Sequence, residues 1–320
     1  GYSNSSPLKS LIWQPTSASV DDLYNEWSSG LIRDYYAGVG GIKLCDSSLD
    51  NPYFVAYEQL NTMDRDRIYG NMSVTGHIIP EQLSLTLRAG VDFSNDFRTQ
   101  QKPQYSHSYT NGMYREQTVR NVEFNTDFLL SWRRTFGDFY LNASLGGNAM
   151  LSNNSNVSLA NQLDEPNVFI LQNVSGQLDV RATRTKKAIN SFYGFLSMSW
   201  RDMIFIDVTG RNDWSSTLAP GYNSYFYPSF SGSVLLDQVF DFAERAPWVD
   251  LLKVRGSWAN VGNDTDPYNL LATYANSPNF TGAYLLPSET LNYYIKPENV
   301  ESWEVGLEAS FFKKRLAFDV

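Results

Sequence analysis

Acid–base and thiol chemistry in this chain depends on very few side chains. The 320 residues include two histidines and one cysteine. His77 falls at the end of an expected strand, beside a short turn, and His107 lies in a long polar segment without an elbow-like Asp or Ser context, so neither is placed as a general base. Cys45 has no disulfide partner and no nearby histidine, which indicates an inert thiol. The sequence predicts no catalytic residue.

Metal and cofactor motifs are also sparse. The run Asn263-Asp264-Thr265-Asp266 has the spacing of a calcium-loop fragment, but it lacks the further glycine and the terminal glutamate, so a turn is the better interpretation. There is no glycine-rich phosphate cradle and no paired-cysteine metal motif. A net charge of −9 without a basic stripe argues against nucleic acid as a partner. We expect neither a cofactor nor a metal.

Aromatic side chains in loop segments offer a binding chemistry instead. Aromatic residues make up 15% of the chain, and several lie between the expected strands. Trp214, Tyr222 and Tyr225, with the neighbouring cation Arg211, are the predicted substrate-binding residues, because such rings stack on sugars or clasp peptides. Packing of the same rings against another protein is the alternative.

The elements that position these loops are two-faced strands. In residues 83–93 every odd position is apolar or small and every even position is polar or glycine, which is the period-2 pattern of a strand with one apolar face. About ten such segments are expected: 67–78, 83–93, 119–132, 139–150, 192–200, 204–210, 226–236, 252–258, 303–311 and a last strand from 316 onward. No run approaches the roughly 18 apolar residues of a helical membrane span. The pattern predicts an all-β fold, an antiparallel transmembrane β-barrel with its apolar face in lipid.

Short and long connections alternate between these strands. Short turns are expected at 79–82, 133–138, 201–203 and 313–315, and long loops at 94–118, 151–188, 212–225 and 261–301. Residues 237–250 could hold a helical turn, and residues 1–66 are expected to be mostly extracellular loop. Bacterial barrels keep short turns on the periplasmic side, where Trp200 next to Arg201 fits an aromatic rim. A soluble β-sandwich or propeller is the alternative fold.

Four segments carry a family resemblance. They are residues 211–218 (RNDWSSTL), 225–229 (YFYPS), 252–263 (LKVRGSWANVGN, with Trp258-Ala259 in place of a more usual Tyr-Gly) and 296–316, which includes ESWEVGLE. In their order and spacing they resemble the SusC/RagA group of TonB-dependent outer-membrane transporters. The resemblance implies a barrel of roughly 22 strands, so residues 1–320 would be part of one barrel domain. The plug domain and the TonB box are expected to be absent from this chain, and both ends are interpreted as cuts.

The resemblance also implies a function and partners. We expect TonB-dependent import of a nutrient, an oligosaccharide or an oligopeptide, across the outer membrane of a Gram-negative, Bacteroidota-like cell, and not an enzyme. The expected partners are a SusD-like surface lipoprotein as lid, the TonB-ExbB-ExbD complex through the missing N-terminal part, outer-membrane lipid and a second copy in a dimeric assembly. The alternatives are a self-contained outer-membrane barrel enzyme and a soluble glycan-binding β domain. Polar residues such as Arg88, Asp127, Arg255 and Glu304 are expected to face the lumen, as wall or plug contacts.

Overall fold

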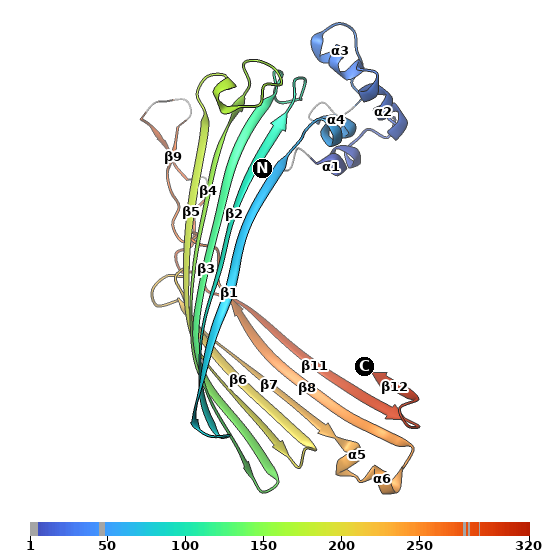
Figure 1. The fold of residues 1–320 in the computed structure, drawn as a ribbon, viewed down its shortest axis with the longest axis vertical. Coiled ribbons are helices and arrows are strands. Elements are labelled where there is room, and N and C mark those ends of the chain that lie inside the picture. The colour runs from blue at the N-terminus through green and yellow to red at the C-terminus, as the bar shows by residue number, and fades with distance from the viewer. Residues whose placement is uncertain (1–5, 45–48, 278–279, 281, 288) are drawn as a thin grey trace. The chain divides into compact units, whose positions relative to one another are not determined.

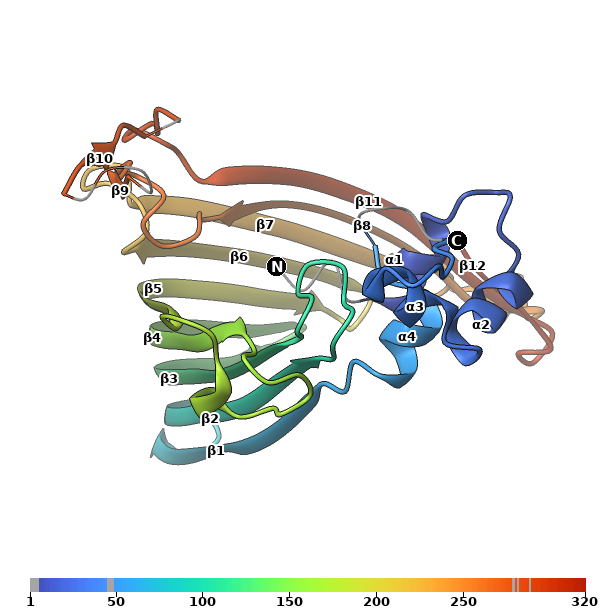
Figure 2. The same cartoon turned by 90° about the horizontal axis from the view of Figure 1, so that it is seen from above.

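The computed structural model describes residues 6–44, 49–277, 280, 282–287 and 289–320. Within this part of the chain, ten strands form one sheet whose order follows the sequence (Figures 1 and 2). The strands are β1 Thr62–Ile79, β2 Leu83–Lys102, β3 Met113–Phe136, β4 Phe139–Gln162, β5 Asp179–Trp200, β6 Ile204–Ser215, β7 Ser224–Leu235, β8 Val249–Asn263, β11 Glu298–Phe311 and β12 Leu316–Asp319. A separate antiparallel pair joins β9 (Ala275–Asn276) and β10 (Tyr284–Leu285).

The connections alternate in length, as the sequence predicts, except that the helical residues 236–248 join β7 to β8 where a short turn would fall. Short ones span residues 80–82, 137–138, 201–203 and 312–315. Longer ones span residues 103–112, 163–178, 216–223 and 264–297, the second with a 3-10 turn at Leu171–Asn173. The helical turn expected in residues 237–250 is confirmed as α5 (Leu236–Val239) and α6 (Phe242–Arg245), which lie between β7 and β8 (Figure 1).

The early strands are longer than predicted. Strands β2 to β5 contain 20, 24, 24 and 22 residues, and they include much of the two segments expected as loops, 94–118 and 151–188. These extensions are polar on both faces, as in the run SNNSNVS at 152–158. Where polar residues occupy both faces of a strand, the apolar alternation disappears although the strand hydrogen bonds continue. The loop prediction was therefore wrong for residues 94–102, 113–118, 151–162 and 179–188.

The strand register aligns residues of one kind in rows across the sheet. One row contains only apolar residues from β5, β6, β7, β8 and β11: Leu196, Val208, Phe230, Trp258 and Trp303. The adjacent row, one residue along each strand, is entirely polar: Ser197, Asp207, Ser231, Ser257 and Glu304. Directly opposed residues share a face, and successive residues alternate between faces. The sheet therefore has one apolar and one polar face, as the alternation predicts.

Helices replace the loop that was expected in residues 1–66. The described residues of this segment form α1 (Pro7–Ile12), α2 (Val20–Ser28), α3 (Leu31–Ala37) and α4 (Pro52–Tyr57). A capping box between Ser19 and Asp22 begins α2, and Asn51 caps α4 ahead of Pro52. The expectation of mostly loop was wrong; the extracellular placement stays a prediction. None of the described helices is long and apolar enough to cross a membrane.

The chain divides into two compact units. One comprises residues 1–68, 93–122 and 154–184, and the other residues 69–92, 123–153 and 185–320. In the first unit, Leu23, Ile32 and Phe54 of the helices are almost fully buried. In the second, the large apolar side chains of the sheet stay exposed on one face. A single sheet layer cannot bury that face by itself, so it needs an apolar surrounding.

Candidate functional site

The polar face of the sheet carries a set of ion pairs between neighbouring strands. They are Arg88–Asp127 at 2.7 Å, Arg255–Glu304 at 3.7 Å and Lys253–Glu308 at 4.0 Å. Next to them, Ser197 Oγ donates to Asp207 at 2.6 Å. All these side chains are at least partly exposed, so each pair contributes little to stability. They give the face a hydrated, charge-balanced surface, and they place together the residues expected to face a lumen.

Arg211 of β6 is held by three neighbours on this face. Its Nε donates to Asp213 Oδ1 at 2.7 Å, its Nη2 donates to Ser191 Oγ at 2.8 Å, and the guanidinium lies 5.8 Å from the Tyr193 ring centroid. The Asp213 carboxylate is nearly buried and also accepts from Tyr227 Oη at 2.6 Å. The Arg211 guanidinium therefore fixes the loop end of β6 and keeps only part of its donor capacity for a ligand.

Two of the predicted tyrosines belong to different ring pairs. Tyr225 of β7 stacks on Tyr227 with centroids 5.8 Å apart, and it lies over Gly262, where an added Cβ would come within 2.6 Å of the ring. Tyr222, in the connection 216–223, makes an edge contact with Tyr294 at 5.6 Å. Gly262 is therefore required for the close approach of the Tyr225 ring.

Trp214 lies on the opposite face from Arg211 and Tyr225. It has the same strand parity as Val208, and its register partners are Asn190 and Ser224. Of the four predicted binding residues, the structure thus brings Arg211 and Tyr225 to one face and places Trp214 on the apolar one. A Trp at the loop end of an apolar face is typical of a membrane-interface belt.

Asp264 is a hydrogen-bonding centre that the sequence did not predict. This carboxylate follows β8 and accepts from Lys187 Nζ at 2.6 Å, from Thr217 Oγ1 at 3.1 Å and from Ser215 Oγ. Burial raises the pKa of Asp264, but these hydrogen bonds and the Lys187 charge outweigh it, so the pKa lies below the usual 3.8. The acidic run that was interpreted as a turn therefore ties the connection 216–223 to β5 and β8. The calcium-like spacing of residues 263–266 marked the acidic run, but no sequence pattern linked it to Ser215 and Thr217, which lie far away in the chain.

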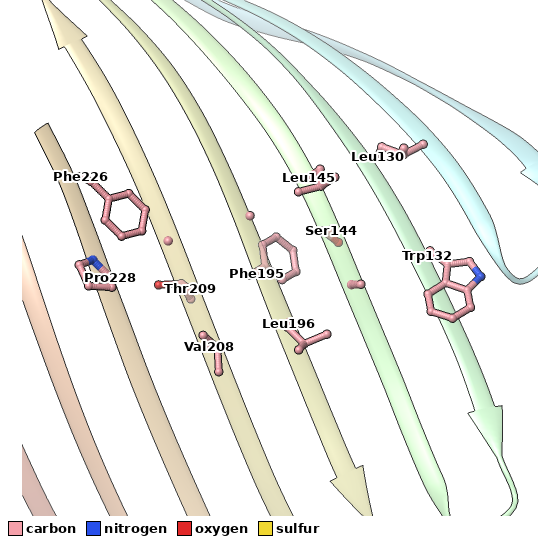
Figure 3. A pocket seen from close by; sticks show the side chains of 13 residues that line it. Leu130, Trp132, Ser144, Leu145, Phe195, Leu196, Val208, Thr209, Phe226 and Pro228 are labelled. Carbon is pink, nitrogen blue, oxygen red and sulfur yellow. The ribbon is translucent and has the colours of Figure 1, made fainter. Parts of the chain in front are cut away.

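A broad hollow lies mainly on the apolar face of the sheet. It is a groove of about 560 Å³ between β3 and β7, lined by Trp132, Leu145, Leu196, Val208 and Phe226 among others (Figure 3). Gly194, Gly210 and Pro228 oppose one another in register at its floor. Because these three residues have small or compact side chains, they leave a depression in three adjacent strands. Larger side chains on either side form its borders. Its lining suits acyl chains rather than a polar cargo.

The two histidines make no catalytic constellation in the described residues. His107 is exposed, and its backbone N–H donates to Asp50 Oδ1 at 2.6 Å. His77 is exposed in β1 close to the short turn at 80–82. Over the described ranges, no group of three or more His, Cys, Asp and Glu is arranged to hold a metal ion. Cys45 lies outside the described residues, so its reactivity stays a prediction.

A sheet with one apolar face, one ion-paired face and loops of alternating length is the wall of a β-barrel. The chain matches the family model "TonB dependent receptor-like, beta-barrel" over residues 11–320, and it belongs to this family. It is similar to TonB-dependent receptor P26 of Formosa agariphila, with 23% identity over 232 residues, which cover 69% of this chain and 23% of that protein.

Solved structures agree on the fold. A structure of the RagAB peptide transporter superposes with a TM-score of 0.68 at 20% identity over 85% of this chain and 31% of that chain. The siderophore receptor PiuA from Acinetobacter baumannii gives a TM-score of 0.51 at 11% identity over 81% of this chain and 40% of that chain. The TonB-dependent receptor family and the barrel fold that the sequence predicts are thus confirmed, and the RagAB structure shares that fold. Barrels of this family are outer-membrane proteins, which places the apolar face in lipid, and this chain spans under half the length of these relatives.

Proposed function

We propose that the protein imports a nutrient across the outer membrane in a TonB-dependent manner, with this chain as part of the barrel wall. The observation that carries the proposal is the pair of rows across five strands, apolar in one and polar in the next. Such a wall separates lipid from an aqueous interior, which is what a transport path requires. Membership of the TonB-dependent receptor family supports the same function.

The cargo we propose is an oligosaccharide or an oligopeptide, received under a SusD-like lipoprotein lid in a dimeric assembly. The RagAB complex, whose fold this chain shares, is described as a peptide transporter. The rings of Tyr222, Tyr225 and Tyr294 at the loop ends suit either cargo, because both sugars and peptides present flat apolar surfaces to aromatic rings. The Arg211 guanidinium adds a hydrogen-bond donor beside Tyr225. TonB, ExbB and ExbD would act through a part of the protein outside this chain.

The exposure of the sheet edges favours a transporter wall over a self-contained enzyme. Strand β1 is exposed along its whole length, and so are Trp303 and Val305 of β11 and all of β12. Unpaired, apolar edge strands would aggregate, so we propose that further strands complete them. The sheet order runs from β1 to β12 without pairing these two in the described residues, whereas a closed ten-strand barrel enzyme would join them.

Growth of the native bacterium tests this function. A strain lacking the gene should lose growth on one class of oligomer, either oligosaccharides or oligopeptides, as its only carbon source. The full-length gene should restore growth, and a gene without its TonB-contacting segment should not. Normal growth of the deletion strain on both oligomer classes, together with hydrolysis by the purified protein that is lost in His107→Ala, would instead establish the enzyme.

A further inference from the structure

The groove of about 560 Å³ on the apolar face has a floor and two side walls. Its floor is the register row of Gly194, Gly210 and Pro228 in strands β5, β6 and β7. Leu145 leans over Gly194 from one side, because a Cβ added to that glycine would lie 3.0 Å from Leu145 Cδ2. Phe226 leans over Gly210 from the other side in the same way, and Figure 3 shows the two walls. The register of three strands therefore builds the groove.

One end of the groove is apolar, and the other end leads to polar side chains. Leu196 and Val208 are paired in register and lie toward the short turns. Toward the long connections, Asn190 of β5 and Trp214 of β6 are paired in register on the same face. Both of these side chains are exposed, and the Asn190 amide and the Trp214 indole each carry a hydrogen-bond donor. The face thus changes from apolar to hydrogen-bonding within six residues of β5.

A cation continues the same face beyond Asn190. Lys186 and Asn190 are four residues apart in β5, so they share a face, and about 13 Å of strand separates them. The next residue, Lys187, bonds Asp264 together with Ser215 of the polar face, which places Lys186 on the apolar one. The Lys186 side chain is exposed, and its ammonium forms no ion pair within the part of the chain that the structure describes. A flexible lysine stem can extend toward the groove and bring its charge close to Asn190.

The membrane around the barrel indicates what occupies the groove. The apolar face of a barrel of this family lies in lipid, so acyl chains run along it. Long connections of bacterial barrels lie on the outer side, so Asn190, Trp214 and Lys186 would lie level with the headgroups of the outer leaflet. In Gram-negative bacteria that leaflet consists of glycolipids that carry acyl chains, sugar hydroxyls and phosphate groups. The order of chemistry in such a lipid matches the order of side chains along this face.

We propose that this face binds one phosphorylated glycolipid of the outer leaflet at a specific site. One acyl chain occupies the groove between Leu145 and Phe226. The sugar accepts hydrogen bonds from the Asn190 amide and the Trp214 indole, and a phosphate pairs with the Lys186 ammonium. The site lies on the face opposite the polar row, so it does not depend on which nutrient the protein imports.

Native mass spectrometry of the full-length protein in detergent tests the proposal. The probes are bisphosphorylated lipid A, its phosphate-free analogue and phosphatidylglycerol, each titrated to give the dissociation constant of the first bound lipid. Lipid A should bind roughly tenfold more tightly than phosphatidylglycerol, because its sugars accept from both Asn190 and Trp214. The phosphate-free analogue should bind roughly fivefold more weakly than lipid A, which is the effect of one cation at a lipid surface.

Two variants locate the site, and each has a matched control. Lys186→Gln should weaken lipid A roughly fivefold and leave the phosphate-free analogue unchanged, whereas Lys313→Gln, the same change in a short turn, should affect neither. Val208→Phe fills the groove and should weaken both lipids by roughly three- to tenfold, because packing is the main attraction between apolar groups in a membrane. Val254→Phe is its control, since Val254 is 38% exposed on the same face, against 37% for Val208, but lies outside the groove lining.

Three results would overturn the inference. Equal affinity for all three lipids is what unspecific contact with the membrane gives, and tighter binding of phosphatidylglycerol would exclude the glycolipid. An equal effect of each variant and its control would place the bound lipid elsewhere on the barrel. A changed oligomeric state in Val208→Phe with unchanged lipid binding would assign the groove to a second copy of the chain.

Discussion

Replacing Asp264 by Asn should loosen the connection 216–223 while the strands stay folded. The carboxylate is 5% exposed, and it accepts from Lys187, Thr217 and Ser215. An Asn side chain keeps one acceptor oxygen, loses the charge and leaves the Lys187 ammonium without its anion. Ser215 ends β6 and Thr217 lies at the start of the connection, so the lost hydrogen bonds destabilise that end of the connection first.

The expected cost follows from the burial of the pair. Removing one partner of a fully buried ion pair costs about 3–5 kcal/mol, and Lys187 is 24% exposed, so water recovers part of that cost. We expect about 2–3 kcal/mol, which corresponds to a roughly 30- to 150-fold rise in the local opening constant. The size of the effect distinguishes Asp264 from an exposed surface carboxylate, whose pairing contributes below about 1 kcal/mol.

Amide hydrogen exchange of the protein in detergent measures that constant directly. The reporters are the backbone N–H of Ser216, which donates to Ala188 O at 2.9 Å, and that of Tyr222, which donates to Ala219 O at 2.9 Å. The control variant is Asp266→Asn, two residues along the chain at an exposed position. Exchange at Ser216 that rises by less than about threefold in Asp264→Asn, or equally in both variants, would refute the role given to this carboxylate.

The same carboxylate predicts how the connection responds to acid. Its pKa lies below the usual value in the folded protein, so the unfolded state binds more protons below about pH 4. The stabilisation is fully present above that pH and is lost as the pH falls through the folded pKa. Exchange at Ser216 should therefore accelerate below about pH 4 in the native protein, after correction for intrinsic rates, and much less in Asp264→Asn.

Two further substitutions test the faces and the ring packing. Val208→Arg on the apolar face should cost about 2–4 kcal/mol of folding free energy in lipid vesicles, whereas Thr209→Arg on the polar face should cost below about 1 kcal/mol, as urea unfolding would show. Equal costs would contradict the assignment of the faces. Gly262→Ala should cost about 1–3 kcal/mol, measured the same way, because its Cβ would lie 2.6 Å from the Tyr225 ring, and Tyr225→Leu in the same chain should recover most of it. A full penalty in that double variant would place the clash elsewhere.

The two faces were predictable because lipid imposes a rule on every residue of a membrane strand. Val208 faces the hydrocarbon and must be apolar, whereas its neighbour Asp207 must face away from it. Each membrane strand therefore shows the period-2 pattern in its sequence. The same argument applied to Trp214 would have placed it with Val208 on the apolar face. The extensions of β2 to β5 at 94–102, 113–118, 151–162 and 179–188 were not predicted as strands, because polar residues occupy both of their faces and no apolar alternation marks them.

The helices and the polar clusters could not be predicted from the sequence, for two different physical reasons. Helices α1 to α4 contain six to nine residues, too short for a 3.6-residue apolar period to stand out, although Ser19 with Asp22 and Asn51 before Pro52 are readable caps. The partners of Asp264 come from β5, from the end of β6 and from the connection after it. Which of these residues meet depends on the register of three strand pairs, and no local pattern encodes that register.

Buried carboxylates at the loop ends link the wall to the binding surface. Asp213 accepts hydrogen bonds from Arg211 and Tyr227, and Asp264 accepts one from Lys187. The charges of both carboxylates act on the Tyr225 hydroxyl and help to raise its pKa. Each carboxylate is bonded by side chains from more than one strand or connection, so the loop bases cannot shift unless several charge-assisted hydrogen bonds break together. A rigid base, together with the buried Leu218 and Ala219 of the connection 216–223, lets the loops present aromatic rings at fixed positions. In a wall only one sheet thick, most apolar side chains of the strands face lipid, so hydrogen bonding of this kind contributes much of the order of a binding surface.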